Sequence, residues 1–161
     1  MEAGASKYLV STEQGYTFLV NKKQTGQNST KIEILNRYGM NGGKHHGPIY
    51  ALERNPSLSK YFLTVGDWTA KVWSEEQKTP LMQTKYHNSY LTDGCWSPTR
   101  KGLFFLSRMD GFIDCWDYLY RQNEVAYSYK VSDNPLTSIA ISKGEGKMLA
   151  VGDSEGSVTM I

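Results

Sequence analysis

The 161-residue sequence predicts an all-β fold of about three and a half four-stranded antiparallel blades, which together form part of one β-propeller over residues 1–161. Two short apolar runs flank a turn with Asp, Glu or Gly, which is typical of a β-hairpin, at residues 8–20, 62–73, 105–116 and 149–161. The last three hairpins end at Trp73, Trp116 and Ile161, which are 43 and 45 residues apart. Propeller blades recur every ~40–45 residues, so this period indicates one blade per hairpin.

The first blade is predicted over residues 6–36, with strands at 6–11, 16–20 and 31–36. Residues 1–5 are too few for an innermost strand. The step from the end of this hairpin at Val20 to Trp73 is 53 residues, which is longer than the later steps. The excess is polar and rich in glycine at 21–30 and 39–44, and this composition favours a surface loop inserted in the blade.

The second and third blades are predicted to be complete. The second blade spans 48–85, with strands at 48–54, 61–65, 69–74 and 81–85, and the third spans 91–131, with strands at 91–96, 103–107, 112–117 and 124–131. Hairpins 62–73 and 105–116 have equal lengths, so they align residue for residue and pair Phe62 with Phe105. Turn signals separate the strands in both blades.

The fourth blade is predicted over 136–161, with strands at 136–142, 148–151 and 157–161. At about 43 residues per blade the sequence holds fewer than four blades, whereas propellers close with typically 4–8. An incomplete propeller leaves apolar faces and strand edges open. We therefore expect the sequence to be a fragment of a longer chain.

Composition excludes several classes of partner. The net charge is +2 and no run of five like charges occurs, so the sequence has no electrostatic footprint for nucleic acid or an anionic membrane. No apolar stretch approaches the ~20 residues of a membrane helix, and the N-terminal residues lack a signal-peptide pattern. We expect an intracellular protein in which Cys95 and Cys115 are buried thiols rather than a disulfide.

Residues 110–117, with the sequence DGFIDCWD, match the signature of a WD repeat. Asp110 caps a tight turn, Gly111 permits a positive φ beside it, and Trp116 is large enough to fill the wedge between blades. Asp67 and Trp73 hold the same places one blade earlier, and Gly156 lies in the turn of the last blade.

The resemblance to WD repeats also implies a histidine partner for the turn aspartate. His45 and His87 stand four residues before Ile49 and Leu91, where WD repeats often carry the histidine that hydrogen-bonds this aspartate. A serine two residues before the aspartate would complete the network, but these places hold Val65 and Arg108. The sequence therefore leaves the full His-Ser-Asp-Trp network open.

Beyond the generic repeat, the sequence resembles the dynein intermediate chain family, most closely its axonemal outer-arm members. The segments that carry this resemblance are 47–56 (GPIYALERNP), 62–76 (FLTVGDWTAKVWSEE), 84–87 (TKYH), 95–98 (CWSP) and 108–111 (RMDG). The resemblance covers roughly residues 47–161. The Gly-Asp-Ser-Glu-Gly turn at 152–156 is shared with inner-arm and cytoplasmic members.

This resemblance implies a non-catalytic scaffold subunit. Its propeller would dock on the tail of a dynein heavy chain, beside the other dynein intermediate chain, and would support assembly of the outer arm and microtubule-based movement. The location implied is the cytoplasm and cytoskeleton, in the axoneme of a cilium or flagellum. The alternative is another WD-repeat adaptor: an inner-arm or cytoplasmic dynein intermediate chain, or a scaffold outside motor complexes.

An enzymatic alternative centres on the glycine-rich loop 39–46, because glycine-rich backbone with Lys44 can cradle phosphate. The spacing is one residue short, His45 replaces the Ser or Thr that binds Mg²⁺, and a strand rather than a helix is predicted next. We expect no catalytic set, no cofactor and no metal. The candidate metal donors, which show no short ligand spacing, are His45, His46, His87, Cys95 and Cys115.

Trp68 is the one candidate partner contact. It occupies a turn position where WD repeats usually carry Gly or Lys, so its side chain is expected to project from the blade edge. Tryptophan is enriched among the residues that dominate protein interfaces. The alternative is that Trp68 packs on its own or the adjacent blade.

Overall fold

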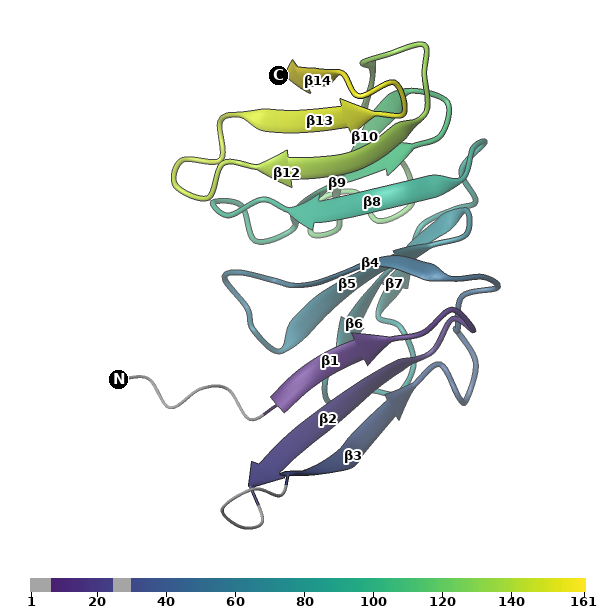
Figure 1. Cartoon of the computed structure of the whole chain (residues 1–161), viewed down its shortest axis with the longest axis vertical. Coiled ribbons are helices and arrows are strands. Elements are labelled where there is room, and N and C mark those ends of the chain that lie inside the picture. Colours follow the sequence, from purple (N-terminus) through teal and green to yellow (C-terminus); the bar gives the residue numbers. More distant parts are fainter. Residues whose placement is uncertain (1–6, 25–29) are drawn as a thin grey trace.

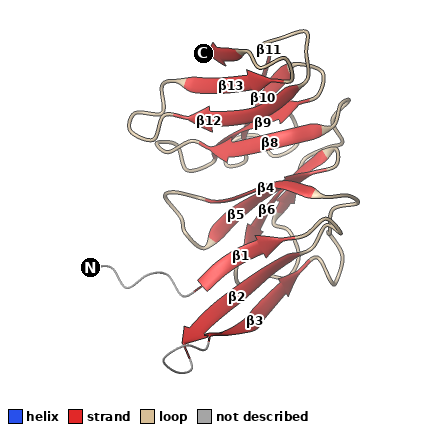
Figure 2. Cartoon of the chain, in the orientation of Figure 1, coloured by secondary structure: helices blue, strands red, loops and turns tan. Residues whose placement is uncertain are grey.

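The computed structural model describes residues 7–24 and 30–161, and every regular element within them is a β-strand (Figure 2). The strands form four separate antiparallel sheets that follow one another along the longest axis of the chain (Figure 1). In each sheet the strands are neighbours in the order of the sequence. The predicted all-β architecture of consecutive blades is therefore confirmed.

Blades 1 and 2 are the two N-terminal sheets. Blade 1 comprises β1 (Lys7–Ser11), β2 (Thr17–Gln24) and β3 (Thr30–Tyr38). Blade 2 comprises β4 (Ile49–Arg54), β5 (Tyr61–Gly66), β6 (Thr69–Ser74) and β7 (Met82–Gln83). Strand β7 is shorter than predicted, since beyond Gln83 the side-chain hydroxyl of Thr84 accepts the Ala70 N–H at 2.9 Å.

Blades 3 and 4 are the two C-terminal sheets. Blade 3 comprises β8 (Leu91–Trp96), β9 (Leu103–Arg108), β10 (Phe112–Asp117) and β11 (Tyr127–Lys130). Blade 4 comprises β12 (Leu136–Ile141), β13 (Leu149–Asp153) and β14 (Val158–Met160). Contacts between β4 and β8, and between β8 and β12, make these the inner strands on which the successive blades meet.

Residues 21–24 of the loop predicted at 21–30 belong to a strand, so that prediction is wrong for these residues. Strand β2 continues to Gln24 and stays in register with β3, where Asn21 lies opposite Glu33. Lys23 Nζ donates to Glu33 Oε2 at 2.7 Å across the two strands, a cross-strand pair of opposite charge that favours the extended ladder. Residues 25–29, like residues 1–6, lie outside the described residues.

The apolar core lies between blades rather than within them. Tyr38 of blade 1 packs with Phe62 and Trp73 of blade 2, and the Phe62 and Trp73 rings stack with centroids 6.1 Å apart. Blades 2 and 3 share a second cluster, and blades 3 and 4 share a third that includes Ile113 and Leu136. Apolar burial of this kind is the main favourable term in folding, so each blade depends on its neighbours.

The hairpins of blades 2 and 3 differ in register, contrary to the residue-for-residue alignment of the sequence. Trp73 lies opposite Phe62, but Trp116 lies opposite Phe104, not Phe105. Phe104 stacks on Trp116 with centroids 6.4 Å apart, as Phe62 stacks on Trp73. The turn of blade 3 therefore holds one residue more, and Gly111 with φ +84° closes it.

Trp116→Ala should lower the free energy of unfolding by about 3–5 kcal/mol, because the indole is 1% exposed in the cluster shared by blades 2 and 3. Chemical denaturation of the full chain measures this loss. Tyr120→Ala is the matched control, since that side chain is 80% exposed. A loss below about 1 kcal/mol for Trp116→Ala would contradict its place in the core.

Candidate functional site

Four buried side chains form a hydrogen-bonded network in blade 2. The indole Nε1–H of Trp73 donates to Thr64 Oγ1 at 2.8 Å, and His45 Nε2 lies 2.8 Å from the same oxygen. An indole can only donate, so the Thr64 hydroxyl accepts from Trp73 and donates its own proton to His45 Nε2. The other ring nitrogen, Nδ1, then carries its hydrogen toward Asp67 Oδ1 at 3.4 Å.

The carboxylate of Asp67 is the end point of this network. Its Oδ2 accepts the backbone N–H of His46 at 2.7 Å, and its Oδ1 accepts the backbone N–H and the hydroxyl of Thr69, both at 2.8 Å. Burial raises the pKa of Asp67, but the hydrogen bonds from His45, His46 and Thr69 outweigh it and hold the pKa well below its ordinary value. Asp67 is thus ionised and joins the β3–β4 connection to the hairpin turn.

Burial has the opposite consequence for His45. It lowers the pKa of the imidazole, and although the hydrogen bond to Asp67 raises it, the net pKa lies below the ordinary value. Neutral imidazole is also the form that can accept the Thr64 hydroxyl proton. The network in blade 2 therefore holds His45 in its neutral form and has a structural role.

Thr64 is the network residue that sequence reasoning missed. The WD-repeat pattern places a hydroxyl two residues before Asp67, where this chain has Val65, but the network hydroxyl is that of Thr64, three residues before Asp67. Thr64 lies two residues after Phe62 on the same face of β5, the face that meets Trp73, whereas Val65 points to the other face. Strand alternation counted from the aromatic pair would have identified it.

Blade 3 builds a different network, and the expected hydrogen bond between His87 and Asp110 is wrong. His87 Nδ1 lies 2.8 Å from Asp114 Oδ2, whereas Asp110 accepts from Arg108, whose Nε lies 2.9 Å from Asp110 Oδ1. The Arg108 guanidinium also reaches Asp114 Oδ2 at 3.0 Å, and the Ser128 hydroxyl donates to Asp114 Oδ1 at 2.6 Å. The longer turn separates Asp110 from the histidine, and Asp114 on β10 replaces it.

Gly156 lies in the last described turn, between β13 and β14. Its φ is +84°, and a Cβ there would meet no atom within 4 Å, so the requirement is for backbone conformation rather than space. Asp153 Oδ1 accepts the backbone N–H groups of Glu155 and Ser157 in the same turn. Gly156 therefore serves the hairpin of blade 4.

Trp68 belongs to an aromatic surface cluster formed by Tyr50, Trp68 and Tyr90. The Trp68 ring meets Tyr90 edge to face at 4.9 Å between centroids, and Tyr90 meets Tyr50 in the same way at 5.9 Å. Trp68 is nevertheless 43% exposed and Tyr50 is also exposed. The side chain therefore packs on the adjacent blade, through Tyr90, and presents apolar area to the outside.

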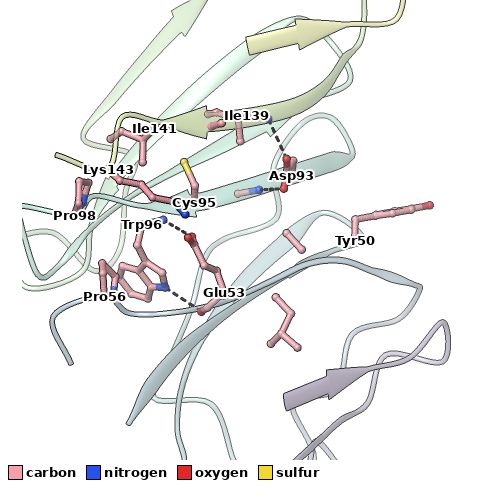
Figure 3. A pocket seen from close by; sticks show the side chains of 14 residues that line it. Tyr50, Glu53, Pro56, Asp93, Cys95, Trp96, Pro98, Ile139, Ile141 and Lys143 are labelled. Atoms are coloured by element: carbon pink, nitrogen blue, oxygen red, sulfur yellow. Dashed lines mark hydrogen bonds between the residues drawn. The ribbon is translucent and has the colours of Figure 1, made fainter. Parts of the chain in front are cut away.

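A cleft of about 560 Å³ lies along the inner strands β4, β8 and β12 (Figure 3). Two carboxylates cross it: Glu53 Oε2 accepts the Trp96 N–H at 2.7 Å, and Asp93 Oδ2 accepts the Ile139 N–H at 2.9 Å. Burial raises the pKa of Glu53, which the hydrogen bond from Trp96 only partly offsets. Each carboxylate thus joins one inner strand to the next, which is a structural role.

The glycine-rich loop 39–44 presents carbonyl oxygens, not N–H groups, to its charged neighbour. Lys71 Nζ donates to Gly43 O at 2.7 Å and to Lys44 O at 2.8 Å. A phosphate cradle needs converging N–H groups, so this arrangement argues against a phosphate site. Within the described residues, 7–24 and 30–161, no group of three or more His, Cys, Asp or Glu side chains is placed so that it could hold a metal ion.

The two cysteines are free thiols, one buried and one half-buried. Burial raises the pKa of Cys95 to about 12 and also raises that of Cys115. Thiols of this kind are protonated and poorly nucleophilic at neutral pH. As for the membrane, no helix in the part of the chain that the structure describes is long and apolar enough to cross one.

Comparison with known proteins identifies the family. Residues 1–161 match the family model described as "Dynein axonemal intermediate chain 3 WD40 domain". The chain is 46% identical to dynein axonemal intermediate chain 2 of Xenopus laevis, over 97% of its own length and 25% of that protein. It is also 46% identical to the dynein 70 kDa intermediate chain, flagellar outer arm, of Chlamydomonas reinhardtii, over 99% of its length and 27% of that protein. The chain belongs to the axonemal dynein intermediate chain family.

This membership confirms the resemblance inferred from the sequence and identifies the four sheets as blades of a WD40 propeller. Similarity to dynein axonemal intermediate chain 3 of Mus musculus is lower, at 30% identity over 100% of this chain and 18% of that protein. The chain spans about a quarter of the length of the intermediate chains it matches at 46% identity. The buried networks of this dynein intermediate chain are those of its WD40 blades.

Thr64→Val should lower the free energy of unfolding by about 1–3 kcal/mol, because it leaves the Trp73 indole N–H and His45 Nε2 buried without a partner. Valine keeps the shape of threonine, so packing is nearly unchanged. Urea denaturation of the full-length protein measures the loss. Thr79→Val, at an exposed threonine, is the control and should leave stability unchanged. Equal effects of both substitutions would contradict the network.

The lowered pKa of His45 predicts acid destabilisation. The folded chain keeps His45 neutral while the unfolded chain protonates its histidine below about pH 6.5, so the free energy of unfolding should fall as the pH decreases from that value. His45→Gln should reduce this slope when unfolding is measured between pH 7 and pH 5. His46→Gln, at the exposed neighbouring histidine, should retain it. An unchanged slope for His45→Gln would refute the assignment.

Proposed function

We propose that this chain is part of a non-catalytic subunit of outer-arm axonemal dynein, which docks on a dynein heavy chain beside the other dynein intermediate chain. The proposal is supported by the 46% identity to a relative named for the flagellar outer arm. ATP hydrolysis belongs to the heavy chain in this proposal, and the subunit contributes assembly and attachment to the microtubule. Its location is the cytoskeleton, in the axoneme of a cilium or flagellum.

The observation that carries a docking function is the aromatic surface cluster of Tyr50, Trp68 and Tyr90. The buried carboxylate of Asp67 fixes the turn from which Trp68 projects, so the indole is presented on a rigid support. Rigid, partly exposed aromatic side chains lose little conformational entropy on binding and are enriched at interface hot spots. We infer that the heavy chain covers this cluster.

The candidate chemical groups support a scaffold over an enzyme. Asp67, Asp114, Glu53 and Asp93 each accept hydrogen bonds from backbone or side-chain donors of the blades. Carboxylates engaged in this way hold the blades together instead of acting on a substrate. We propose that residues 1–161 form part of one propeller in which function resides in the surface.

A second candidate is a subunit of the dynein that contains axonemal intermediate chain 3, because the matching family model carries that description. The identity is 30% to that protein against 46% to intermediate chain 2, which favours the outer-arm proposal. Purification of the full-length tagged protein from axonemes distinguishes the two. The heavy chain that co-sediments with it identifies the dynein.

Trp68→Ala should weaken association of the full-length protein with the heavy chain by at least about tenfold, the effect of losing one interface hot spot. Co-sedimentation from axonemal extracts measures the association, and thermal melting measures folding. Because Trp68 is half-exposed, the melting temperature should change little.

Tyr120→Ala is the matched control, since this exposed aromatic residue lies outside the cluster. It should leave association intact. Loss of folding in Trp68→Ala, or equal binding by both variants, would instead assign Trp68 a packing role.

A further inference from the structure

Blade 3 has no hydroxyl at the place where blade 2 uses one. Thr64 pairs with Lys71 across β5 and β6, two residue pairs along the register from the Phe62–Trp73 pair. In blade 3 the register runs from the Phe104–Trp116 pair to the Leu106–Asp114 pair. Leu106 therefore occupies the position of Thr64, and its side chain is fully buried.

Two nitrogen atoms are left without the partner that Thr64 provides in blade 2. Trp116 Nε1 and His87 Nε2 are buried and make no hydrogen bond to any residue in 7–24 or 30–161. The Trp116 residue is 1% exposed, and the His87 side chain is 3% exposed. Burying a polar group with no hydrogen bond costs free energy of folding, so we expect both atoms to have a hydrogen-bond partner.

The neighbouring hydroxyl of Ser107 does not supply that partner. Its Oγ lies 2.9 Å from Thr92 Oγ1 and donates to Asp93 O at 3.4 Å, both on β8. Successive side chains of a strand point to opposite faces. Leu106 shares the face of Phe104, while Ser107 faces away from Trp116.

The geometry also defines what kind of group fits. His87 Nδ1 lies 2.8 Å from the Asp114 carboxylate, which can only accept, so Nδ1 carries a hydrogen, and the tautomer with its single hydrogen on Nδ1 has a lone pair at Nε2. Trp116 Nε1–H can only donate. A group placed between them must accept from Trp116 and donate to His87, which a hydroxyl or a water molecule does and a carboxylate does not.

Open space borders both residues. A groove of about 240 Å³ is lined by His87, Arg108, Asp114 and Trp116, together with residues of the β7–β8 and β10–β11 connections. A water molecule occupies about 30 Å³ in the liquid, so the groove admits one and connects it to the outside. Both unpartnered residues line this groove.

We propose that blade 3 binds a structural water molecule between Trp116 Nε1 and His87 Nε2. This water accepts the indole hydrogen and donates to the imidazole, as the Thr64 hydroxyl does between Trp73 and His45 in blade 2. The water molecule takes the place of the hydroxyl that Thr64 has and Leu106 lacks.

Leu106→Thr tests the proposal, with Leu106→Val as the matched control of the same shape without a hydroxyl. In the full-length protein, a high-resolution structure of the parent and of Leu106→Val should show a water within hydrogen-bond distance of both nitrogen atoms. In Leu106→Thr the threonine hydroxyl should replace it. Because that hydroxyl gains two partners, Leu106→Thr should also melt at a higher temperature than Leu106→Val.

Two results would overturn the proposal. One is a parent structure in which Trp116 Nε1 or His87 Nε2 binds a protein group, including a hydroxyl from a partner chain, instead of water. The other is a lower melting temperature for Leu106→Thr than for Leu106→Val, since a buried hydroxyl without partners is destabilising.

Discussion

Burial of apolar side chains between successive sheets is the interaction on which this structure depends. Each of the three core clusters takes residues from two neighbouring blades, and the tryptophans of β6 and β10 are among them. Trp73 and Trp116 each stack on a phenylalanine of the adjacent strand. Because no blade buries its faces alone, the relative positions of blades and their internal registers are decided together.

A tryptophan in the core needs a hydrogen-bond partner for its indole N–H, and the two central blades differ in the groups that surround it. The indole N–H and the histidine ring must both be satisfied where water is excluded. Blade 2 does so with the Thr64 hydroxyl and with Asp67 in the turn. Blade 3 has Leu106 instead of the hydroxyl, and its histidine faces Asp114 on the strand. Similar aromatic packing therefore tolerates different polar arrangements.

The two blades also reverse the charge beside the histidine. Lys71 of blade 2 donates to backbone carbonyls of the 39–44 loop, whereas Asp114 at the corresponding position of blade 3 accepts from His87, Arg108 and Ser128. Burial raises the pKa of Asp114, but these three hydrogen bonds lower it by more than burial raises it. The net pKa is below the ordinary value, so the carboxylate is ionised. Both charged side chains are thus engaged in hydrogen bonds within the fold.

The sequence by itself determined the all-β class, the blade period and the family, because hairpin patterns and turn residues are local signals. His45, Asp67 and Trp73 were also found from local spacing. Only the tertiary structure decided that Phe104, not Phe105, faces Trp116, since one extra turn residue shifts the register without disturbing the apolar pattern. It alone brought Asp114 to His87, and Tyr50 and Tyr90 to Trp68, because these contacts join segments whose distance depends on how the strands and blades pack.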